Sequence, residues 1–175
     1  MPSIFSHRVP SPSENNYQKY RPYIREDFHE CCAYCLLHER FANGERNFEL
    51  DHFKPKSKYD QLKEVYTNIY YSCHVCNRGK WHHWPSEELQ SKGYRFIDTC
   101  RETFSEHFVD EDGYWKPISN AGKYTAERIR LNSPHNIEIR KMVKSLHNQL
   151  SDSVLDWDKP IKDQLIPLID ALLEK

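Results

Sequence analysis

The chain has 175 residues, of which 38% are hydrophobic, with four Trp, eleven Tyr and eight Phe, enough for one modest core with helical extensions. Lys and Arg number 25 against 26 for Asp and Glu. This balance excludes a whole-molecule field that attracts polyanions, so nucleic acid can be drawn only to a local patch. No stretch approaches the roughly 18 to 20 apolar residues of a membrane span, and the first residues lack the apolar core of a secretory signal, so we expect a cytoplasmic protein with no membrane partner.

The first twenty residues are predicted to be a flexible N-terminal arm. Up to Asn16 the segment carries three Pro and four Ser among polar residues, a composition typical of loops. A short helix is then expected, because Pro22 suits a first helical position and Ile24 and Phe28 are four residues apart.

A turn, two strands and a helix are predicted in the next part of the chain. Asn43-Gly44 is a turn signal before a strand from Asn47 to Phe53. Ile69 to Tyr71 reads as a second short strand that runs toward a cysteine pair. A helix is expected to begin near Asn77 and to stop before Pro85.

The second half is expected to continue with strands and then helices. Tyr94 to Asp98 is predicted as a strand, and Asp112-Gly113 is a strong hairpin signal between Phe108-Val109 and Tyr114-Trp115. Ser133-Pro134 resembles a helix cap followed by Pro at the first helical position, and apolar residues continue from there at mostly helical spacing.

A last helix is predicted from Pro160, bent or broken near Pro167. The apolar stripes of these C-terminal helices indicate core or subunit interface. We therefore expect an α+β fold with an arm (residues 1–20), a small zinc-stapled core (residues 21–95), and a hairpin and helical extension that packs on the core or on a partner (residues 96–175).

Two Cys-x-x-Cys pairs, Cys32–Cys35 and Cys73–Cys76, can together hold one tetrahedral zinc ion. In a reducing compartment such pairs are better interpreted as a metal site than as disulfides. A rubredoxin-like iron site remains an alternative. Cys31 can compete as a ligand, but the two-residue gap to Cys35 favours Cys32 instead. Cys100 is interpreted as a packed thiol.

A second, harder metal site is predicted between and just after the cysteine pairs. His52 suits a general base, because an imidazole with a pKa near neutrality can take a proton from water. Asp51 and Asn77 are candidate oxygen ligands for Mg²⁺ or Mn²⁺. Phosphodiester hydrolysis needs such a base and such a cation. Five cations are candidates for contact with a nucleic-acid backbone: Lys54, Lys56, Lys58, Arg78 and Lys80.

The order of these residues resembles the HNH endonucleases of the ββα-metal, or His-Me finger, class. The positions that carry the resemblance are Cys32, Cys35, Glu49, Leu50, Asp51, His52, Phe53, Pro55, Ser57, Asn68, Cys73, Cys76, Asn77 and Lys80. The resemblance implies that His52 activates water and that Asn68 orients this imidazole through backbone hydrogen bonds. It also implies that Asp51 and Asn77 share one catalytic Mg²⁺ or Mn²⁺, while Zn²⁺ is structural. The family name gives His as the third residue of its motif. This sequence has Asn77 at that position, and so resembles the HNN variant.

A fainter resemblance continues to about residue 145. Asp112-Gly113, residues 126–132 and Arg140 are similar to the helical tail of bacterial HNH proteins associated with phage defence, some of which work beside an ATPase subunit. This resemblance implies a defence effector that has an ATPase or another subunit as partner. The leading hypothesis for the whole chain is a DNA endonuclease, with RNA left open as substrate.

Two alternatives remain open from the residues alone. One is a non-catalytic zinc ribbon that binds nucleic acid or a protein partner. The other concerns the catalytic ion, which His82 or His83 can reach if Asn77 does not.

Overall fold

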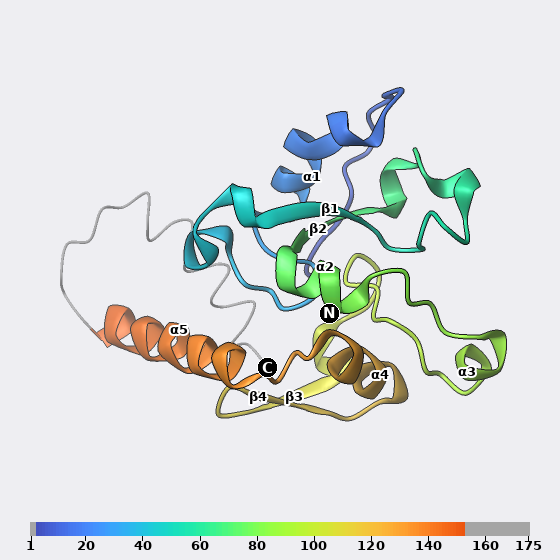
Figure 1. Cartoon of the computed structure of the whole chain (residues 1–175). Coiled ribbons are helices and arrows are strands. Elements are labelled where there is room, and N and C mark those ends of the chain that lie inside the picture. Colours follow the sequence, from blue (N-terminus) through green and yellow to red (C-terminus); the bar gives the residue numbers. More distant parts are fainter. Residues whose placement is uncertain (1–2, 153–175) are drawn as a thin grey trace.

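The computed structural model describes residues 3–152, which form two small antiparallel hairpins and five α-helices (Figure 1). The predicted α+β class is confirmed. The helix expected from Pro160 lies outside the described residues. None of the helices within residues 3–152 has the length and apolar content to cross a membrane.

The N-terminal segment is packed against the rest of the molecule, contrary to the expectation of a flexible arm. Phe5 is only 1% exposed and its ring lies 5.0 Å from that of Phe28. Arg8 forms an ion pair of 2.7 Å with the buried carboxylate of Asp27. A loop composition indicates the absence of periodic structure, but one buried aromatic side chain and one buried ion pair are sufficient to hold such a segment.

A 3-10 helix at Tyr17–Tyr20 and α1 at Arg21–Asp27 follow this segment. The start of α1 agrees with the prediction, since Pro22 occupies its first turn. Asn16 caps the 3-10 helix by accepting a hydrogen bond from the backbone of Gln18 at 2.9 Å. The two elements lie beside the first hairpin (Figure 1).

The first hairpin pairs β1 (Phe48–His52) with β2 (Ile69–Cys73). Both strands were predicted to within two residues. Helix α2 (His74–Lys80) follows β2 directly. It begins earlier than expected because Cys73 caps its N-terminus, and it ends where Trp81 adopts a positive φ of 47°.

The strand expected at Tyr94 to Asp98 is absent, and the segment is irregular. Phe96 and Ile97 are nevertheless buried, each 1% exposed. The hydroxyl of Thr125 accepts a hydrogen bond from the Ile97 amide at 3.0 Å. The Thr125 side chain therefore satisfies a backbone amide that would otherwise need a partner on a neighbouring strand. This explains why the apolar run forms no strand here.

The second hairpin, β3 (Phe108–Glu111) with β4 (Tyr114–Pro117), confirms the turn signal. Asp112 and Gly113 both have positive φ, 52° and 79°, as a two-residue I′ turn requires. Helix α5 (Pro134–Asp152) crosses this turn closely. A Cβ at Gly113 would lie 2.8 Å from a backbone oxygen in the first turn of α5.

Helix α4 (Asn120–Ile129), together with the short α3 (Glu87–Ser91), completes the described helices. α4 lies between α2 and the second hairpin (Figure 1). On both sides the backbone of α4 approaches another backbone closely at a glycine. A Cβ added to Gly79 of α2 would lie 3.2 Å from Ile129 Cα in α4, and a Cβ added to Gly122 of α4 would lie 2.4 Å from the His107 carbonyl oxygen. The second half of the chain therefore supports one flank of α2.

Candidate metal centre and catalytic site

The four cysteines of the two Cys-x-x-Cys pairs form a buried cluster at the junction of β2, α2 and the loop at residues 32–35. Their sulfur atoms all lie within 4.8 Å of one another, and Cys35 Sγ and Cys73 Sγ are 3.8 Å apart. A tetrahedral zinc with Zn–S bonds of about 2.3 Å requires sulfur–sulfur edges of about 3.8 Å. The cluster is therefore compatible with zinc.

Backbone amides support the cluster, and the other two cysteines lie outside it. Tyr34 N donates to Cys32 Sγ and Cys76 N donates to Cys73 Sγ, both at 3.5 Å. Burial raises the pKa of Cys31, and burial raises the pKa of Cys100 to about 12. Neither belongs to the cluster of sulfur atoms formed by Cys32, Cys35, Cys73 and Cys76.

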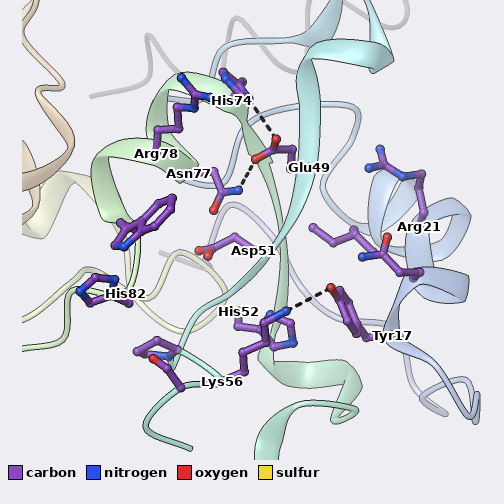
Figure 2. Close-up of a pocket in the computed structure, with 15 residues that line it drawn as sticks. Tyr17, Arg21, Glu49, Asp51, His52, Lys56, His74, Asn77, Arg78 and His82 are labelled. Atoms are coloured by element: carbon purple, nitrogen blue, oxygen red, sulfur yellow. Dashed lines mark hydrogen bonds and ion pairs between the residues drawn. The ribbon is translucent and has the colours of Figure 1, made fainter. Parts of the chain in front are cut away.

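A solvent-accessible pocket opens along β1 and α2 (Figure 2). It brings together all three residues predicted for the hard metal site and the base, Asp51, His52 and Asn77. The other main lining residues are Tyr17, Gln18, Arg21, Glu49, Lys56, His74, Arg78, Trp81 and His82.

Asp51 is only 5% exposed, and its carboxylate is held by two donors. Lys80 Nζ lies 2.9 Å from one carboxylate oxygen and 3.1 Å from the other. The Tyr34 hydroxyl donates to the first of these oxygens. A carboxylate offers about four lone-pair positions, so Asp51 keeps one position, on Oδ1, for a further partner.

Lys80 is fully buried, which corrects its predicted contact with nucleic acid. Its ammonium donates to the His52 carbonyl at 2.7 Å as well as to Asp51. The reason is helical geometry: Lys80 lies four residues after Cys76 in α2, on the face that packs toward the core. A charge in this position is stabilised by its carboxylate partner and cannot reach a phosphate in solvent.

Glu49 fixes the orientation of Asn77. The amide nitrogen of Asn77 donates to one carboxylate oxygen of Glu49, and His74 Nδ1 lies 2.9 Å from the other. Because the nitrogen is used in this way, the amide oxygen faces the pocket and the Asp51 carboxylate (Figure 2). Hydrogen bonds from Asn77 and His74 outweigh the effect of burial and lower the pKa of Glu49.

The imidazole of His52 projects from the opposite face of β1 to Asp51. Its Nε2 lies 2.9 Å from the carbonyl oxygen of Lys63. A carbonyl can only accept, so Nε2 carries the hydrogen and Nδ1 keeps its lone pair. Burial lowers the pKa of His52, which keeps the ring neutral at neutral pH.

Asn68 ties together the loop that carries this carbonyl. Its Oδ1 accepts from Lys54 N at 2.9 Å, and its Nδ2 donates to the carbonyls of Lys54 and Leu62 at 3.1 and 3.2 Å. Leu62 precedes Lys63, whose oxygen receives the His52 hydrogen bond. Asn68 therefore contacts the backbone one residue before the carbonyl that receives the imidazole hydrogen bond.

The remaining predicted cations are all exposed. Lys56 and Arg78 line the pocket, whereas Lys54 and Lys58 do not. Lys58 donates to the Trp84 carbonyl at 3.4 Å. Of the two alternative histidines, His82 lines the pocket and His83 does not.

Comparison with protein families matches residues 32–82 to HNH endonuclease. This segment of the chain is similar to HNH endonuclease domains. HNH domains act on nucleic acids with a divalent metal, and the family indicates nuclease activity. No curated protein matches the chain. The HNH segment contains β1, β2, α2 and the cysteine cluster, whereas Tyr17 and Arg21 reach the pocket from outside it.

Sequence reasoning gave no role in this site to four residues: Tyr17, Tyr34, Glu49 and His74. Glu49 lies two residues before Asp51, so strand alternation places both carboxylates on one face of β1, and this signal was available. The contacts of the other three depend on the tertiary arrangement. No local pattern reveals them.

Proposed function

We propose that the protein is a Mg²⁺- or Mn²⁺-dependent endonuclease that hydrolyses phosphodiester bonds of DNA. The observation that carries the proposal is the convergence of three unused groups on one pocket. These are the Nδ1 lone pair of His52, the free lone pair of Asp51 Oδ1 and the amide oxygen of Asn77. The HNH match supports the same reading.

In the proposed reaction, His52 Nδ1 takes a proton from a water molecule as the water oxygen attacks phosphorus. The bond from phosphorus to the leaving sugar oxygen breaks, and that oxygen is protonated from solvent. Asp51 and Asn77 would hold the divalent ion, which when bound supplies positive charge to the phosphate and the leaving oxygen. Lys63 and Asn68 keep the imidazole in the tautomer and orientation that leave Nδ1 free.

In the same proposal, zinc bound by Cys32, Cys35, Cys73 and Cys76 is structural. Four thiolates complete a tetrahedron and leave no open position for water or substrate. The cluster joins the loop before β1 to the end of β2, and β2 pairs with the strand that carries His52. Thiols that serve as ligands also fit the reducing cytoplasmic setting that we propose.

One observation favours the alternative, a zinc-ribbon module that binds nucleic acid or a protein without turnover. The carboxylate of Asp51 is already balanced by the buried ammonium of Lys80, as in a structural ion pair. In such a module, replacement of Asp51, His52 or Asn77 would leave binding unchanged.

A plasmid assay separates the two functions. With Mg²⁺ or Mn²⁺ added, we expect the wild-type protein to nick or cut plasmid, and His52→Ala to lose about 10²- to 10⁴-fold in rate, the usual contribution of a general base. His135→Ala, an exposed histidine on α5, is the matched control and should cut at the wild-type rate. Zinc content and thermal unfolding of each variant show that the fold is intact. Full activity of a folded His52→Ala protein would refute the assignment of the base.

The biological setting is a further part of this proposal. The resemblance of the tail supports a role as effector of a bacterial phage-defence system, beside an ATPase or another subunit. Co-purification of the chain with the products of neighbouring genes, followed by phage challenge of cells that carry His52→Ala, tests this part separately. Equal protection by wild type and His52→Ala would contradict a nuclease effector role.

A further inference from the structure

One wall of the catalytic pocket is built by the N-terminal 3-10 helix, outside the segment that matches the HNH family. We propose that Tyr17 and Lys56 form a phosphate-binding pair that holds the nucleic-acid strand over His52, and that Tyr17 is also a positioning residue for the imidazole. The proposal rests on the function proposed above and identifies the part of the site that binds the substrate backbone.

Tyr17 lies directly against the proposed base. The ring centroids of Tyr17 and His52 are 4.6 Å apart, with an interplanar angle of 64°, an edge-to-face contact. The backbone of Tyr17 is anchored in turn, since its amide donates to the carboxylate of Glu64. The imidazole is thereby held between the Lys63 carbonyl and a fixed aromatic ring. Loss of this ring would leave the imidazole free to rotate away from the attacking water.

Lys56 brings a cation to the same place. Its Nζ lies 3.4 Å from the Tyr17 hydroxyl and 5.2 Å from the centre of the Tyr17 ring. The side chain is exposed and lines the pocket. Among the residues whose side chains the structure describes, Lys56 has no carboxylate partner, whereas Lys63 and Lys80 each have one.

The chemistry of the pair matches a phosphodiester oxygen. When the Tyr17 hydroxyl accepts from Lys56, its own hydrogen remains free, so a phenol and an ammonium offer two donors side by side. Non-bridging phosphate oxygens accept such donors, and an unpaired cation strengthens the contact. Arg21 lines the same wall but is already engaged, since both of its terminal nitrogens donate to the Phe48 carbonyl at 3.2 Å.

The position of the pair is also suitable. His52 lies between Tyr17 on one side and Asp51 and Asn77 on the other (Figure 2). A strand whose scissile phosphate faces Asp51 and Asn77 would present a neighbouring phosphate to Tyr17 and Lys56. Contacts of this kind fix the register of the strand, and they need no particular base.

The binding test uses the zinc-loaded protein without added Mg²⁺ or Mn²⁺ and a fluorescein-labelled DNA duplex, with anisotropy measured over a series of KCl concentrations. Lys56→Ala should lower the slope of log affinity against log salt by about 0.9, the value for one lost phosphate contact on duplex DNA. Lys56→Arg should restore the slope. Tyr17→Phe should weaken binding by about two- to tenfold, the range for one lost hydrogen bond. The matched control is Lys19→Ala, a cation of the same 3-10 helix that does not line the pocket.

The positioning role is tested by single-turnover cleavage at saturating protein. Tyr17→Phe keeps the ring and should cut bound DNA at close to the wild-type rate. Tyr17→Ala removes the ring and should cut bound DNA at least tenfold more slowly, because misplacement of a reacting group is costly. Zinc content and thermal unfolding verify that each variant is folded. If Tyr17→Ala does not fold, Tyr17→Phe and the two Lys56 variants still decide the phosphate-binding pair.

The outcomes separate this inference from the nuclease proposal. If the wild type binds DNA but does not cut it, the nuclease proposal fails. The salt slopes of the Lys56 variants then still show whether Tyr17 and Lys56 contact a phosphate. If the wild type cuts DNA and Lys56→Ala has the same slope as Lys19→Ala, the pair is refuted and the nuclease proposal stands. A wild-type protein that does not bind the duplex at low salt, or equal slowing by Tyr17→Phe and Tyr17→Ala, would also overturn the inference.

Discussion

Glu49 determines which atom of Asn77 faces the pocket. A side-chain amide can present either its oxygen or its nitrogen, and only the oxygen can bind a cation. The Glu49 carboxylate accepts but does not donate, so it fixes the nitrogen on its own side. His74 holds the other carboxylate oxygen at 2.9 Å and keeps Glu49 in place. Metal sites commonly depend on such outer contacts.

The change Glu49→Gln tests this role. A glutamine offers both a donor and an acceptor, so the Asn77 amide can reverse. We expect the Mn²⁺ concentration needed for half-maximal cleavage to rise by about 10- to 100-fold, as measured in a Mn²⁺ titration of plasmid cutting. Glu138→Gln on the exposed side of α5 is the matched control. An unchanged Mn²⁺ requirement in a folded Glu49→Gln protein would refute the role of Glu49 in orienting the Asn77 amide.

At the same scale, the sequence predicted which residues share the pocket but not all of their roles. Asp51 and His52 are adjacent on one strand, and Asn77 follows a cysteine ligand, so local connectivity brings them together. The burial of Lys80 depends on core packing around α2, including Phe96, whose ring centre lies 5.8 Å from the ammonium. A contact across the fold of this kind leaves no local pattern.

At the scale of elements, α4 is the helix on which the arrangement of the second half depends. Its first turn approaches the backbone near β3 so closely that only glycine fits at residue 122, where a Cβ would lie 2.4 Å from the His107 oxygen. Ser119 caps the helix by accepting from the Gly122 amide at 2.9 Å. The two contacts together fix the angle at which α4 leaves the second hairpin.

We expect Gly122→Ala to destabilise the protein. Helix propensity alone would favour alanine by about 1 kcal/mol, but the new methyl group would collide with backbone, and overpacking of this kind costs about 1 to 3 kcal/mol or more. Urea unfolding should show a net loss of stability. Lys123→Ala, at an exposed position in the same helix, should be neutral or slightly stabilising. A Gly122→Ala protein as stable as wild type would mean that α4 can shift away from the hairpin.

The elements that the sequence predicted well are those with strong local signals. Asp112-Gly113 defines the second hairpin, and Asn43-Gly44 marks the turn before β1. Helix α4 was not predicted, because Gly122 and Thr125 lower helix propensity within its ten residues. The strand expected at Tyr94 to Asp98 failed for the opposite reason: its apolar residues are buried, but Thr125 takes the backbone hydrogen bonds.

At the scale of the whole molecule, the cysteine cluster connects distant parts of the chain. It fastens the loop at residues 32–35 to the end of β2 and the start of α2. Zinc bound by four thiolates contributes on the order of 10 kcal/mol or more to folding in small zinc domains. That amount is comparable to the whole stability of an ordinary domain.

The change Cys73→Ser is therefore expected to abolish zinc binding and to unfold the domain. Native mass spectrometry reports the zinc content, and circular dichroism reports the fold. Cys100→Ser, which alters a half-buried thiol outside the cluster, should keep one zinc and the wild-type spectrum. A zinc-free Cys73→Ser protein with native circular dichroism would show that the fold does not depend on the metal.

The close approach of Gly79 to Ile129 sets a limit on how the domain can be dissected. The family match ends at residue 82. However, Gly79 of α2, the helix that carries Asn77, packs against the backbone of Ile129 at the end of α4. A fragment cut shortly after the match would leave that helix flank bare, and transplanting the motif alone into another scaffold would lose the same support. Any minimal version of this protein should retain the chain at least through α4.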